Sequence, residues 1–495
     1  MQRHLLLPLL LWLAACRSLS PTPAPETHVL TFLQLNDVYE IGPLAGGTIG
    51  GMARVATLRS QLLAENPHTY TILAGDFLSP SVIGTVKYEG RRIAGAQMVD
   101  AMNYLGVDYV TFGNHEFDLK EADLLARIDA SHFTWVASNV LHKQGGAARS
   151  FQQAGQDLPR AVVVTVGGLR MGIMGLTLDA NQPGYVQYAD VYATARHLYD
   201  SLAPISDLVV AITHLSIDQD RELARQVPGL RLVMGGHEHD HHLEYVGDVL
   251  IAKADANAKT AYVHRLYQGR KPRQLAFRAE LVPVGEGLGF DPVVDSVVHV
   301  WEERAYAAFR AEGFDLNAPV AHLPEPMDGR EASVRNGPTN LGVALAHAMY
   351  EAAAPVDAAV VNSGSIRIDD QLTGDITEFD ILRTLPFGGS VLVAELEGRL
   401  LRQLLDDGEA NRGTGGYLQY WNIDREGGNW RVARQPLDDA GVYRIAVSDF
   451  LLTGQEARMG YFTPANPAVR QVVQPAEDSR ARDIRLALVD YLKKQ

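Results

Sequence analysis

The amino-acid sequence predicts an α/β protein that folds as two domains. Its 495 residues are too many for one hydrophobic core, because single domains usually contain about 100–200 residues. Short aliphatic runs alternate with amphipathic helical stretches, which is the pattern of strands covered by helices. Hydrophobic residues make up 46% and charged residues 21%, so the chain has enough apolar side chain to build a core.

The charge of the chain argues against one class of partner. Asp and Glu outnumber Lys and Arg by 59 to 44, which gives a formal net charge of −15, and no basic block offsets it. We therefore expect no nucleic-acid polymer as a partner. After the first residues no apolar run reaches the roughly 18 residues needed to cross a bilayer, so we expect no integral membrane protein.

The beginning of the chain predicts a signal peptide (residues 1–16) followed by a flexible tether (17–27). Residues 1–4 are a short basic start, residues 5–13 are apolar but too short to span a membrane, and Leu13-Ala14-Ala15-Cys16 has the small residues of a cleavage site. Cys16 is the only cysteine, which excludes an intramolecular disulfide and a cysteine zinc cluster. The tether is rich in proline, which neither packs nor continues a helix.

The sequence L-A-A-C resembles the bacterial lipobox. The resemblance implies that Cys16 becomes a lipid anchor and that the chain is exported, to the periplasmic side or the cell surface of a bacterium. The alternative is an ordinary secretory signal with a chance cysteine.

Seven aliphatic runs predict the strands of the first domain (residues 28–285), and each ends near Asp, Asn, His or Gly. They are Val29–Leu35, Tyr70–Ala74, Tyr109–Thr111, Phe133–Ala137, Met171–Leu176, Leu208–Ile212 and Leu230–Met234. Apolar residues at helical spacing over 51–65, 97–105 and 120–128 predict helices that cover the sheet. Strand ends are where α/β sheets place functional side chains.

A change of character near residues 280–325 predicts the domain boundary. Prolines and glycines surround a charged helix over 295–312, and we assign residues 286–325 to a linker region. Residues 326–495 predict a second α/β domain. Its expected elements are helices over 340–353 and 398–405 and strands over 358–361 and 443–447.

Five polar segments that follow predicted strands contain metal-ligand side chains. They are N-D-V-Y (36–39), G-D-F-L-S-P (75–80), G-N-H-E-F-D (113–118), T-H (213–214) and G-G-H-E-H (235–239). Any one of them is more often a turn or a helix cap. Five together, with carboxylate, amide and imidazole groups beside glycines, predict a metal centre.

The order and local sequence of these motifs resemble the calcineurin-like metallophosphatases, specifically the 5'-nucleotidase family. The resemblance implies an N-terminal four-layer β-sandwich flanked by helices and a C-terminal substrate domain. It also implies a cofactor of two divalent ions such as Zn²⁺ or Mn²⁺, whose mixed oxygen and imidazole ligands need no thiolate. Two ions about 3.5–4 Å apart can hold a hydroxide between them and clamp the attacked phosphoryl group.

The resemblance also implies a role for each ligand. Asp76 would bridge the ions, and the remaining ligands would be Asn114, His214 and His237 for one site and Asp37 and His239 for the other. His115 and Asp118 would be a catalytic pair in which Asp118 orients His115 and raises its pKa, so that a cationic imidazole assists the leaving oxygen. The alternative is that His115 caps a helix that starts at Phe117.

Two features of the metal motifs affect the expected ligand set: the residue at position 39 and the histidine-rich run 237–242. The family's first motif usually reads Asp-x-His, whereas this chain has Asp37-Val38-Tyr39, and a neutral phenol is a weak ligand. We therefore expect a different or weaker first site, not a loss of activity. In the run 237–242 only His237 and His239 share one side, so we assign His241 and His242 to solvent or to a position behind the ligands.

The second domain contains N-S-G-S-I-R (362–367), L-P-F-G-G (385–389) and V-S-D-F-L (447–451), which resemble the family's substrate domain. The resemblance implies that Arg367 contacts phosphate and that Tyr417 and Phe450 clamp a nucleobase. Arg383 is a further phosphate candidate. The alternative for Phe450 is core packing. Where the family reads G-G-D-G-Y, this chain has Gln455-Glu456, so Glu456 would have to replace the nucleoside-binding Asp.

These observations predict a lipid-anchored, two-metal phosphohydrolase that removes the 5'-phosphate from nucleoside monophosphates. A nearer alternative keeps the chemistry and changes the ester, to a cyclic nucleotide, a nucleotide sugar or a non-nucleotide phosphate. An alternative of another class is a non-catalytic protein that binds nucleotide or metal. Retention of the His115 and Asp118 pair argues against the last, because a binder does not need it.

Overall fold

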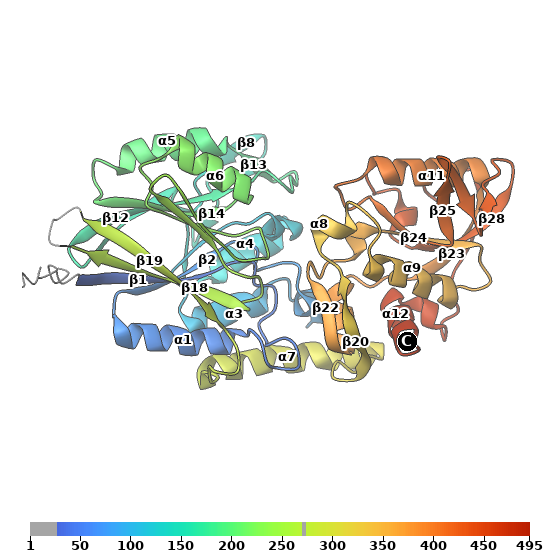
Figure 1. The fold of residues 1–495 in the computed structure, drawn as a ribbon, viewed down its shortest axis with the longest axis horizontal. Helices are drawn as coiled ribbons and strands as arrows, with labels where there is room; N and C mark the ends of the chain where they lie inside the picture. Colours follow the sequence, from blue (N-terminus) through green and yellow to red (C-terminus); the bar gives the residue numbers. More distant parts are fainter. Residues whose placement is uncertain (1–26, 270–273) are drawn as a thin grey trace, which may run out of the picture.

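The structure is a computed structural model that describes residues 27–269 and 274–495 (Figure 1). The predicted signal peptide, Cys16 and nearly all of the tether lie outside the described residues. The first part of the chain, blue to yellow in Figure 1, forms one body, and the last part, orange to red, forms a second body beside it. The predicted α/β class is confirmed.

Two six-stranded sheets form the centre of the first domain. The strands of one are β1 (Thr27–Leu35), β2 (Thr69–Ala74), β5 (Tyr109–Thr111), β6 (Thr134–Trp135), β18 (Thr260–Gln268) and β19 (Leu275–Pro283). Those of the other are β11 (Ala161–Val166), β12 (Leu169–Thr177), β14 (Leu208–His214), β15 (Leu232–Gly235), β16 (His242–Val246) and β17 (Val249–Lys253). Their orders are β19-β18-β1-β2-β5-β6 and β11-β12-β14-β15-β17-β16.

Helices cover the outer face of each sheet. On the first sheet lie α1 (Met52–Glu65), α3 (Ala96–Leu105), α4 (Glu121–Ala130) and α7 (Pro292–Glu312). On the second lie α5 (Val191–Leu202) and α6 (Ile217–Gln226). Between the sheets, Phe32 and Ile72 pack against Ile173 and Val210. Each inner strand is therefore buried on both faces, which is why it reads as a continuous aliphatic run, and the predicted four-layer sandwich is confirmed.

In the first domain the aliphatic runs did not predict β11 or the four strands from β16 to β19. Along β16 and β19 half-buried and exposed positions alternate, because each is an edge strand with one face toward solvent. The predicted strand 133–137 shortens to the two residues of β6, which lies at the other edge of the first sheet.

The predicted linker region is divided between the two domains. Helix α7 begins at an Asp291 cap with Pro292 at its first position and packs on α1 and α3 through Val294, Val298 and Trp301. After it, β20 (Pro319–Asp328) pairs antiparallel with β22 (Gln371–Thr377) of the second domain.

The second domain is a five-stranded sheet with helices on both faces. Its order is β24 (Leu418–Trp421), β21 (Ala358–Asn362), β28 (Val442–Ser448), β23 (Val391–Glu397) and β29 (Val469–Val473). Helices α9 (Asn340–Ala352) and α12 (Ile484–Leu492) cover one face, and α11 (Gly398–Ala410) covers the other. The helices and strands predicted for this domain are present with slightly shifted ends.

Short elements complete the described chain. They are α2 (Val82–Thr85), α8 (Glu331–Val334), α10 (Glu378–Thr384), β3 (Lys87–Tyr88), β4 (Arg91–Arg92), β7 (Val140–Gln144), β8 (Ala147–Arg149), β9 (Gln152–Gln153), β10 (Gln156–Asp157), β13 (Val186–Tyr188), β25 (Ile423–Glu426), β26 (Asn429–Val432), β27 (Gln435–Pro436) and four 3₁₀ turns. Among the residues that the structure describes, no helix has the length and apolar character needed to cross a bilayer.

Candidate metal centre

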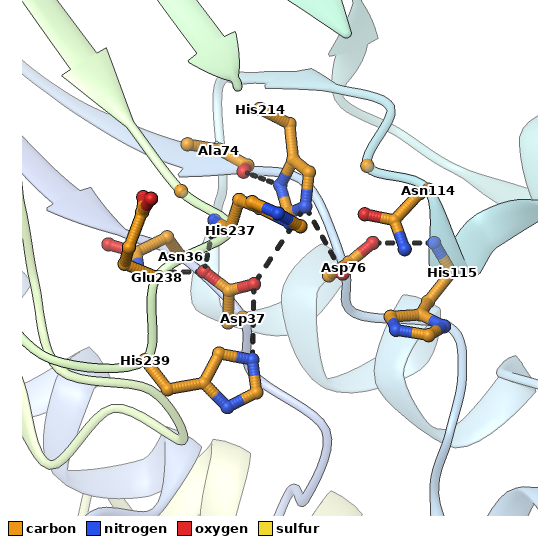
Figure 2. Close-up of polar contacts among 12 residues, drawn as sticks. Asn36, Asp37, Ala74, Asp76, Asn114, His115, His214, His237, Glu238 and His239 are labelled. Carbon is orange, nitrogen blue, oxygen red and sulfur yellow. Dashed lines mark hydrogen bonds and ion pairs between the residues drawn. The ribbon is translucent and has the colours of Figure 1, made fainter. Parts of the chain in front are cut away.

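The five polar segments meet at one edge of the sandwich. Strands β1, β2 and β5 run parallel in one sheet, and β12, β14 and β15 run parallel in the other. Parallel strands end at the same edge, so the segments that follow β1, β2, β5, β14 and β15 converge there. Figure 2 shows the candidate ligands pointing toward one another around Asp37 and Asp76.

Asp37, Asp76 and His214 form the buried centre of the cluster. One ligand atom from each lies within 4.8 Å of the others. Nε2 of His214 is 3.2 Å from Oδ2 of Asp76 and 3.9 Å from Oδ1 of Asp37. On the opposite side of Asp37, Nε2 of His239 is 3.6 Å from the same Oδ1 (Figure 2). Asp37 therefore faces both the His214 side and the His239 side.

Three of the buried ligand atoms have no hydrogen-bond partner among the described residues: Oδ1 of Asp37, Oδ1 of Asn114 and Nε2 of His214. Burying a polar atom without a partner is costly, so an unpaired group of this kind indicates a place for a ligand. The other ring nitrogen of His214, Nδ1, donates to the carbonyl oxygen of Ala74 at 2.8 Å. Because a carbonyl only accepts, Nε2 carries no hydrogen in the neutral ring and is free to bind an ion.

The charges of the cluster favour the binding of a cation. Burial by itself would lower the pKa of His214, but the charges of Asp76 and Asp37 raise it to about 9. Burial would likewise raise the pKa of Asp76, yet the charges of His214 and His115 hold it well below its usual value. Protons on imidazole thus supply positive charge between carboxylates, and a divalent ion can displace them.

His237 differs from the other two histidines. Burial and then the charge of His214 lower the pKa of His237 to about 4, so its ring is neutral. A neutral imidazole is the form that binds a metal. The donor set of two carboxylates, an amide oxygen and three imidazoles fits divalent ions such as Zn²⁺ or Mn²⁺.

The backbone around the ligands adopts conformations that side chains usually avoid. Asp37, Asp76 and His237 have positive φ angles of 53°, 57° and 84°. Such strain at three candidate ligands points to a functional constraint. A Cβ at Gly113 would collide with the carboxylate of Asp76, which explains why the G-N-H motif begins with glycine.

Glu116 holds the backbone beneath the bridging ligand. Its Oε2 accepts hydrogen bonds from the backbone N–H groups of Asp76 at 2.9 Å and Gly113 at 2.6 Å, and its Oε1 accepts those of Phe77 and Leu78. Burial, and next the charge of Asp76, raise the pKa of Glu116 to about 7. The Glu of G-N-H-E-F-D therefore positions the turn that presents Asp76.

A buried lysine holds the two turns that carry His214 and His237. Lys253, the last residue of β17, donates to the carbonyl oxygens of Leu215 at 2.6 Å and Gly236 at 2.7 Å. Its ammonium also pairs with Asp220 at 3.0 Å and with Glu238. Glu238 is therefore engaged by Lys253, a residue that no sequence motif had indicated.

The structure brings His115 and Asp118 together as a pair. Both lie in a 3₁₀ turn (His115–Asp118), and Nδ1 of His115 is 2.7 Å from Oδ2 of Asp118. The residue at the cap position of this turn is Asn114, so the capping role considered for His115 is not the one it has here. Burial opposes protonation, but the charge of Asp76 and the hydrogen bond to Asp118 raise the pKa of His115.

Two further residues contact this pair. Nδ2 of Asn181 donates to Oδ1 of Asp118 at 2.7 Å, a contact that no motif had indicated. Nη2 of Arg367, from the second domain, is 3.4 Å from Oδ2 of Asp118 and 3.2 Å from Nδ1 of His115. The phosphate candidate Arg367 therefore lies beside the candidate catalytic pair.

Tyr39 takes the place where the family usually has histidine. Its hydroxyl is 3.1 Å from Nε2 of His239 and donates to Oδ2 of Asp76 at 3.3 Å. Burial and the charge of Asp76 raise the pKa of Tyr39 well above its ordinary value. The phenol oxygen points into the cluster, so the substitution changes a candidate ligand and not a distant residue.

A cavity of about 360 Å³ opens onto the cluster between the two domains. Asp76, His115, His237 and His239 line it from the first domain, and Arg330, Arg335 and Asp369 line it from the second. His241 is exposed and pairs with Asp255 at 3.0 Å, and His242 also lines the rim. Charged side chains of both signs, from both domains, therefore line the space next to the candidate ligands.

The aromatic residues of the second domain are placed differently from the predicted clamp. Phe450 (42% exposed) and Phe387 (58% exposed) both line a cavity of about 590 Å³ together with Asn362 and Glu456. Tyr417 is 1% exposed, does not line this cavity and packs beneath the Arg412 guanidinium. In this structure Phe387 shares a cavity with Phe450, whereas the role of Tyr417 in a clamp stays a prediction. Phe387 belongs to the L-P-F-G-G motif of the sequence.

The two remaining sequence candidates, Arg383 and Glu456, line two different cavities. Arg383 is on α10, buried, 3.4 Å from Asp380, and lines a small cavity with Tyr39, Glu40 and Arg367. Oε2 of Glu456 accepts a hydrogen bond from Nδ2 of Asn362 at 3.0 Å. Glu456 thus lines the cavity that Phe387 and Phe450 also line, here called the aromatic cavity. A replacement for the family Asp would have to lie there.

Comparison with known proteins agrees with this architecture. The family model described as calcineurin-like phosphoesterase matches residues 30–241, and the one described as 5'-nucleotidase, C-terminal domain, matches residues 319–463. The 5'-nucleotidase of Bos taurus is 25% identical over 503 residues, which cover 87% of this chain and 84% of that protein.

Two further relatives extend the comparison. The trifunctional nucleotide phosphoesterase protein YfkN of Bacillus subtilis is 26% identical over 78% of this chain, although the chain spans only 28% of that longer protein. The crystal structure of a 5'-nucleotidase precursor from Thermus thermophilus shares the fold with a TM-score of 0.70 and 24% identity, and the match covers 94% of this chain and 96% of that one. With both domains matched in order, the chain belongs to the 5'-nucleotidase family of calcineurin-like phosphoesterases.

Proposed function

We propose that this phosphoesterase hydrolyses nucleoside 5'-monophosphates to nucleoside and phosphate at a centre of two divalent ions. Residues 28–285 supply the chemistry and residues 326–495 supply the specificity. The observation that carries the proposal is the set of buried ligand atoms on Asp37, Asn114 and His214 that lack a hydrogen-bond partner among the described residues. Those of Asp37 and His214 cluster with Asp76, which lines a cavity shared by both domains.

The chain's own residues divide into two ligand groups. Asp76 lies between Tyr39 and His214 and is suited to bridge. Asn114, His214 and His237 would hold one ion, and Asp37 and His239 the other. When bound, the ions supply a nucleophile at neutral pH and neutralise charge on the phosphoryl oxygens.

His115 acts on the leaving group in this proposal. Its raised pKa favours the protonated imidazole, and Asp118 fixes the ring through Nδ1. The protonated ring can then donate to the departing ester oxygen or stabilise its charge. Arg367, within hydrogen-bond reach of the pair, places a fixed cationic fork where phosphate enters.

The second domain would select the nucleoside. Phe387 lines the aromatic cavity and also a neighbouring one that Asp118 and Arg367 line, so the aromatic cavity continues toward the catalytic pair. A base seated between Phe387 and Phe450 gains about 1–3 kcal/mol from each stacking contact. Glu456 and Asn362 offer an acceptor and a donor for the sugar.

Phosphate release from a panel of esters tests the proposal. The purified protein is assayed with AMP, UMP, a cyclic nucleotide, a nucleotide sugar and an aryl phosphate, each with Mn²⁺, with Zn²⁺ or with chelator. We expect metal-dependent preference for a nucleoside monophosphate. Activity on the aryl phosphate alone would retain the metal centre and overturn the nucleoside pocket, and inactivity with every metal would favour a binding protein.

We further propose that the chain is exported and held at a bacterial membrane by a lipid on Cys16. The basic start, the short apolar run and L-A-A-C support this proposal. Metabolic labelling with a radioactive fatty acid tests it. We expect label on the wild-type protein and none on Cys16→Ser, whereas an unlabelled, freely released wild-type protein would indicate an ordinary secretory signal.

A further inference from the structure

Two neighbouring carboxylates of the second domain reach the first domain at the metal centre. Oδ2 of Asp369 is 2.9 Å from Nδ1 of His239, and the same nitrogen is 3.2 Å from the backbone carbonyl oxygen of Asp369. The next residue, Asp370, pairs with Lys259 of the first domain. Asp369 and His239 are 130 residues apart in the chain, so this contact exists only while the two domains are docked.

Asp369 is itself held firmly. It has a positive φ of 42°, and its second carboxylate oxygen, Oδ1, accepts a hydrogen bond from the backbone N–H of Glu331, the first residue of α8. Both oxygens of the carboxylate are therefore used, one inside its own domain and one toward His239. A residue in a strained backbone conformation at a domain contact is a candidate for a functional role.

The contact decides which nitrogen of His239 is available for an ion. A carboxylate and a carbonyl oxygen can only accept, so Nδ1 of His239 carries the hydrogen and donates it to Asp369. Nε2 is left facing Oδ1 of Asp37 at 3.6 Å. Metal-binding histidines in proteins are commonly oriented by a carboxylate in this way, which fixes the tautomer and raises the basicity of the ligand nitrogen.

We infer that Asp369 is a positioning residue through which the substrate domain completes the metal site of His239. The inference rests on the two-ion centre of the proposed function. Because the carboxylate lies in one domain and the imidazole in the other, ion binding and this domain arrangement stabilise each other. Such coupling is reciprocal, so whatever favours the docked arrangement also tightens this site.

Calorimetric titration with Mn²⁺ tests the positioning role. We expect wild type to bind two ions, and Asp369→Ala to weaken one of them about 10- to 100-fold while the other keeps its affinity. Asp369→Asn, which retains an acceptor of the same shape, should weaken the site less and guards against a folding defect. Asp375→Asn, which changes an exposed carboxylate of β22 that pairs with His322, is the matched control.

Hydrogen exchange measures the reciprocal effect. Mn²⁺ should slow exchange of the backbone amides of residues 366–372 in wild type, and His239→Ala should abolish that protection. Two ions bound to Asp369→Ala with wild-type affinities, or protection unchanged in His239→Ala, would overturn the inference and leave the proposed function intact. If wild type itself fails to bind two ions, the two-ion centre falls, and the inference falls with it.

Discussion

The ammonium nitrogen of Lys253 lies 2.7 Å from the carbonyl oxygen of Gly236, the residue before the candidate ligand His237. It also lies 2.6 Å from the carbonyl oxygen of Leu215, the residue after the candidate ligand His214. One buried charge thus fixes the two turns that carry these histidines. The charge of Asp220 and that of Glu238 raise the pKa of Lys253 against the opposing effect of burial.

Replacing this lysine should destabilise both the fold and the metal centre. Lys253→Met leaves the buried carboxylate of Asp220 and the half-buried carboxylate of Glu238 without their cation. Breaking a buried ion pair in this way costs about 3–5 kcal/mol. Urea unfolding and metal content measure the two effects. Adding Asp220→Asn should restore part of the stability, and Lys87→Met, on exposed β3, is the control. An unchanged unfolding free energy would show that Lys253 contributes nothing net.

Substitutions in the candidate catalytic pair and in the candidate ligands should differ in their effects on turnover and on metal content. His115→Ala should lower kcat about 10²- to 10⁴-fold with near-normal metal content, because the imidazole acts on the ester and not on the ions. Asp76→Ala should lose metal and activity together. Turnover assays with metal analysis on the same samples check both. Full turnover in His115→Ala would remove the pair from the mechanism.

Tyr39 should control the affinity and preference of the first metal site. Tyr39→His restores the imidazole of the family motif at a position 3.1 Å from Nε2 of His239, and we expect tighter binding of one Zn²⁺. Tyr39→Phe keeps the ring and removes only the oxygen, so it should weaken that site if the oxygen binds the ion. Competition with a chromogenic chelator measures both. Identical affinities in all three proteins would mean that the side chain is no ligand.

The nucleoside pocket should depend on Phe387 and not on the hydroxyl of Tyr417. Phe387→Ala and Phe450→Ala should each raise KM for AMP about 5- to 150-fold, which corresponds to about 1–3 kcal/mol of stacking. Tyr417→Phe is the matched control, because Tyr417 is 1% exposed and lies outside the cavity. Initial-rate measurements decide between them. A KM for AMP that is unchanged in Phe387→Ala would remove Phe387 from the proposed nucleoside pocket.

The stability of the metal-free protein should depend on pH through His214. Its pKa in the folded protein is about 9 against an ordinary value of 6.5, so its protonation stabilises the fold fully below pH 6.5 and this contribution disappears as the pH rises through 9. We expect the difference in unfolding free energy between wild type and His214→Gln to shrink over that interval by roughly 1–3 kcal/mol. Chelator-treated samples are unfolded with urea at each pH.

Bound metal should oppose this pH dependence of the stability of the folded protein. Because bound ions replace the protons, saturating Mn²⁺ should raise Tm more near pH 9 than near pH 6.5, the two pKa values of His214 in the folded and unfolded chain. His241→Ala, which alters an exposed histidine paired with Asp255, is the control. An equal increase in Tm at both pH values would contradict the competition between protons and ions.

The sequence by itself determined the α/β class, the division into two domains and the ligand motifs. The physical reason is local: buried central strands read as aliphatic runs, and a ligand that follows such a strand is marked by its position. For the same reason the edge strands β16 and β19 escaped prediction, because their alternating burial leaves no continuous run.

Only the tertiary structure decided which residues support the site. Lys253, Asn181 and Asp369 contact candidate site residues, or the turns that carry them, across long distances in the chain, and no spacing rule connects such residues. The tertiary structure also placed Phe387, and not Tyr417, in one cavity with Phe450. This cavity is formed where the turn after α10 meets the turn after β28. Local motifs specify which atoms bind, whereas packing between strands and between domains specifies which residues hold them.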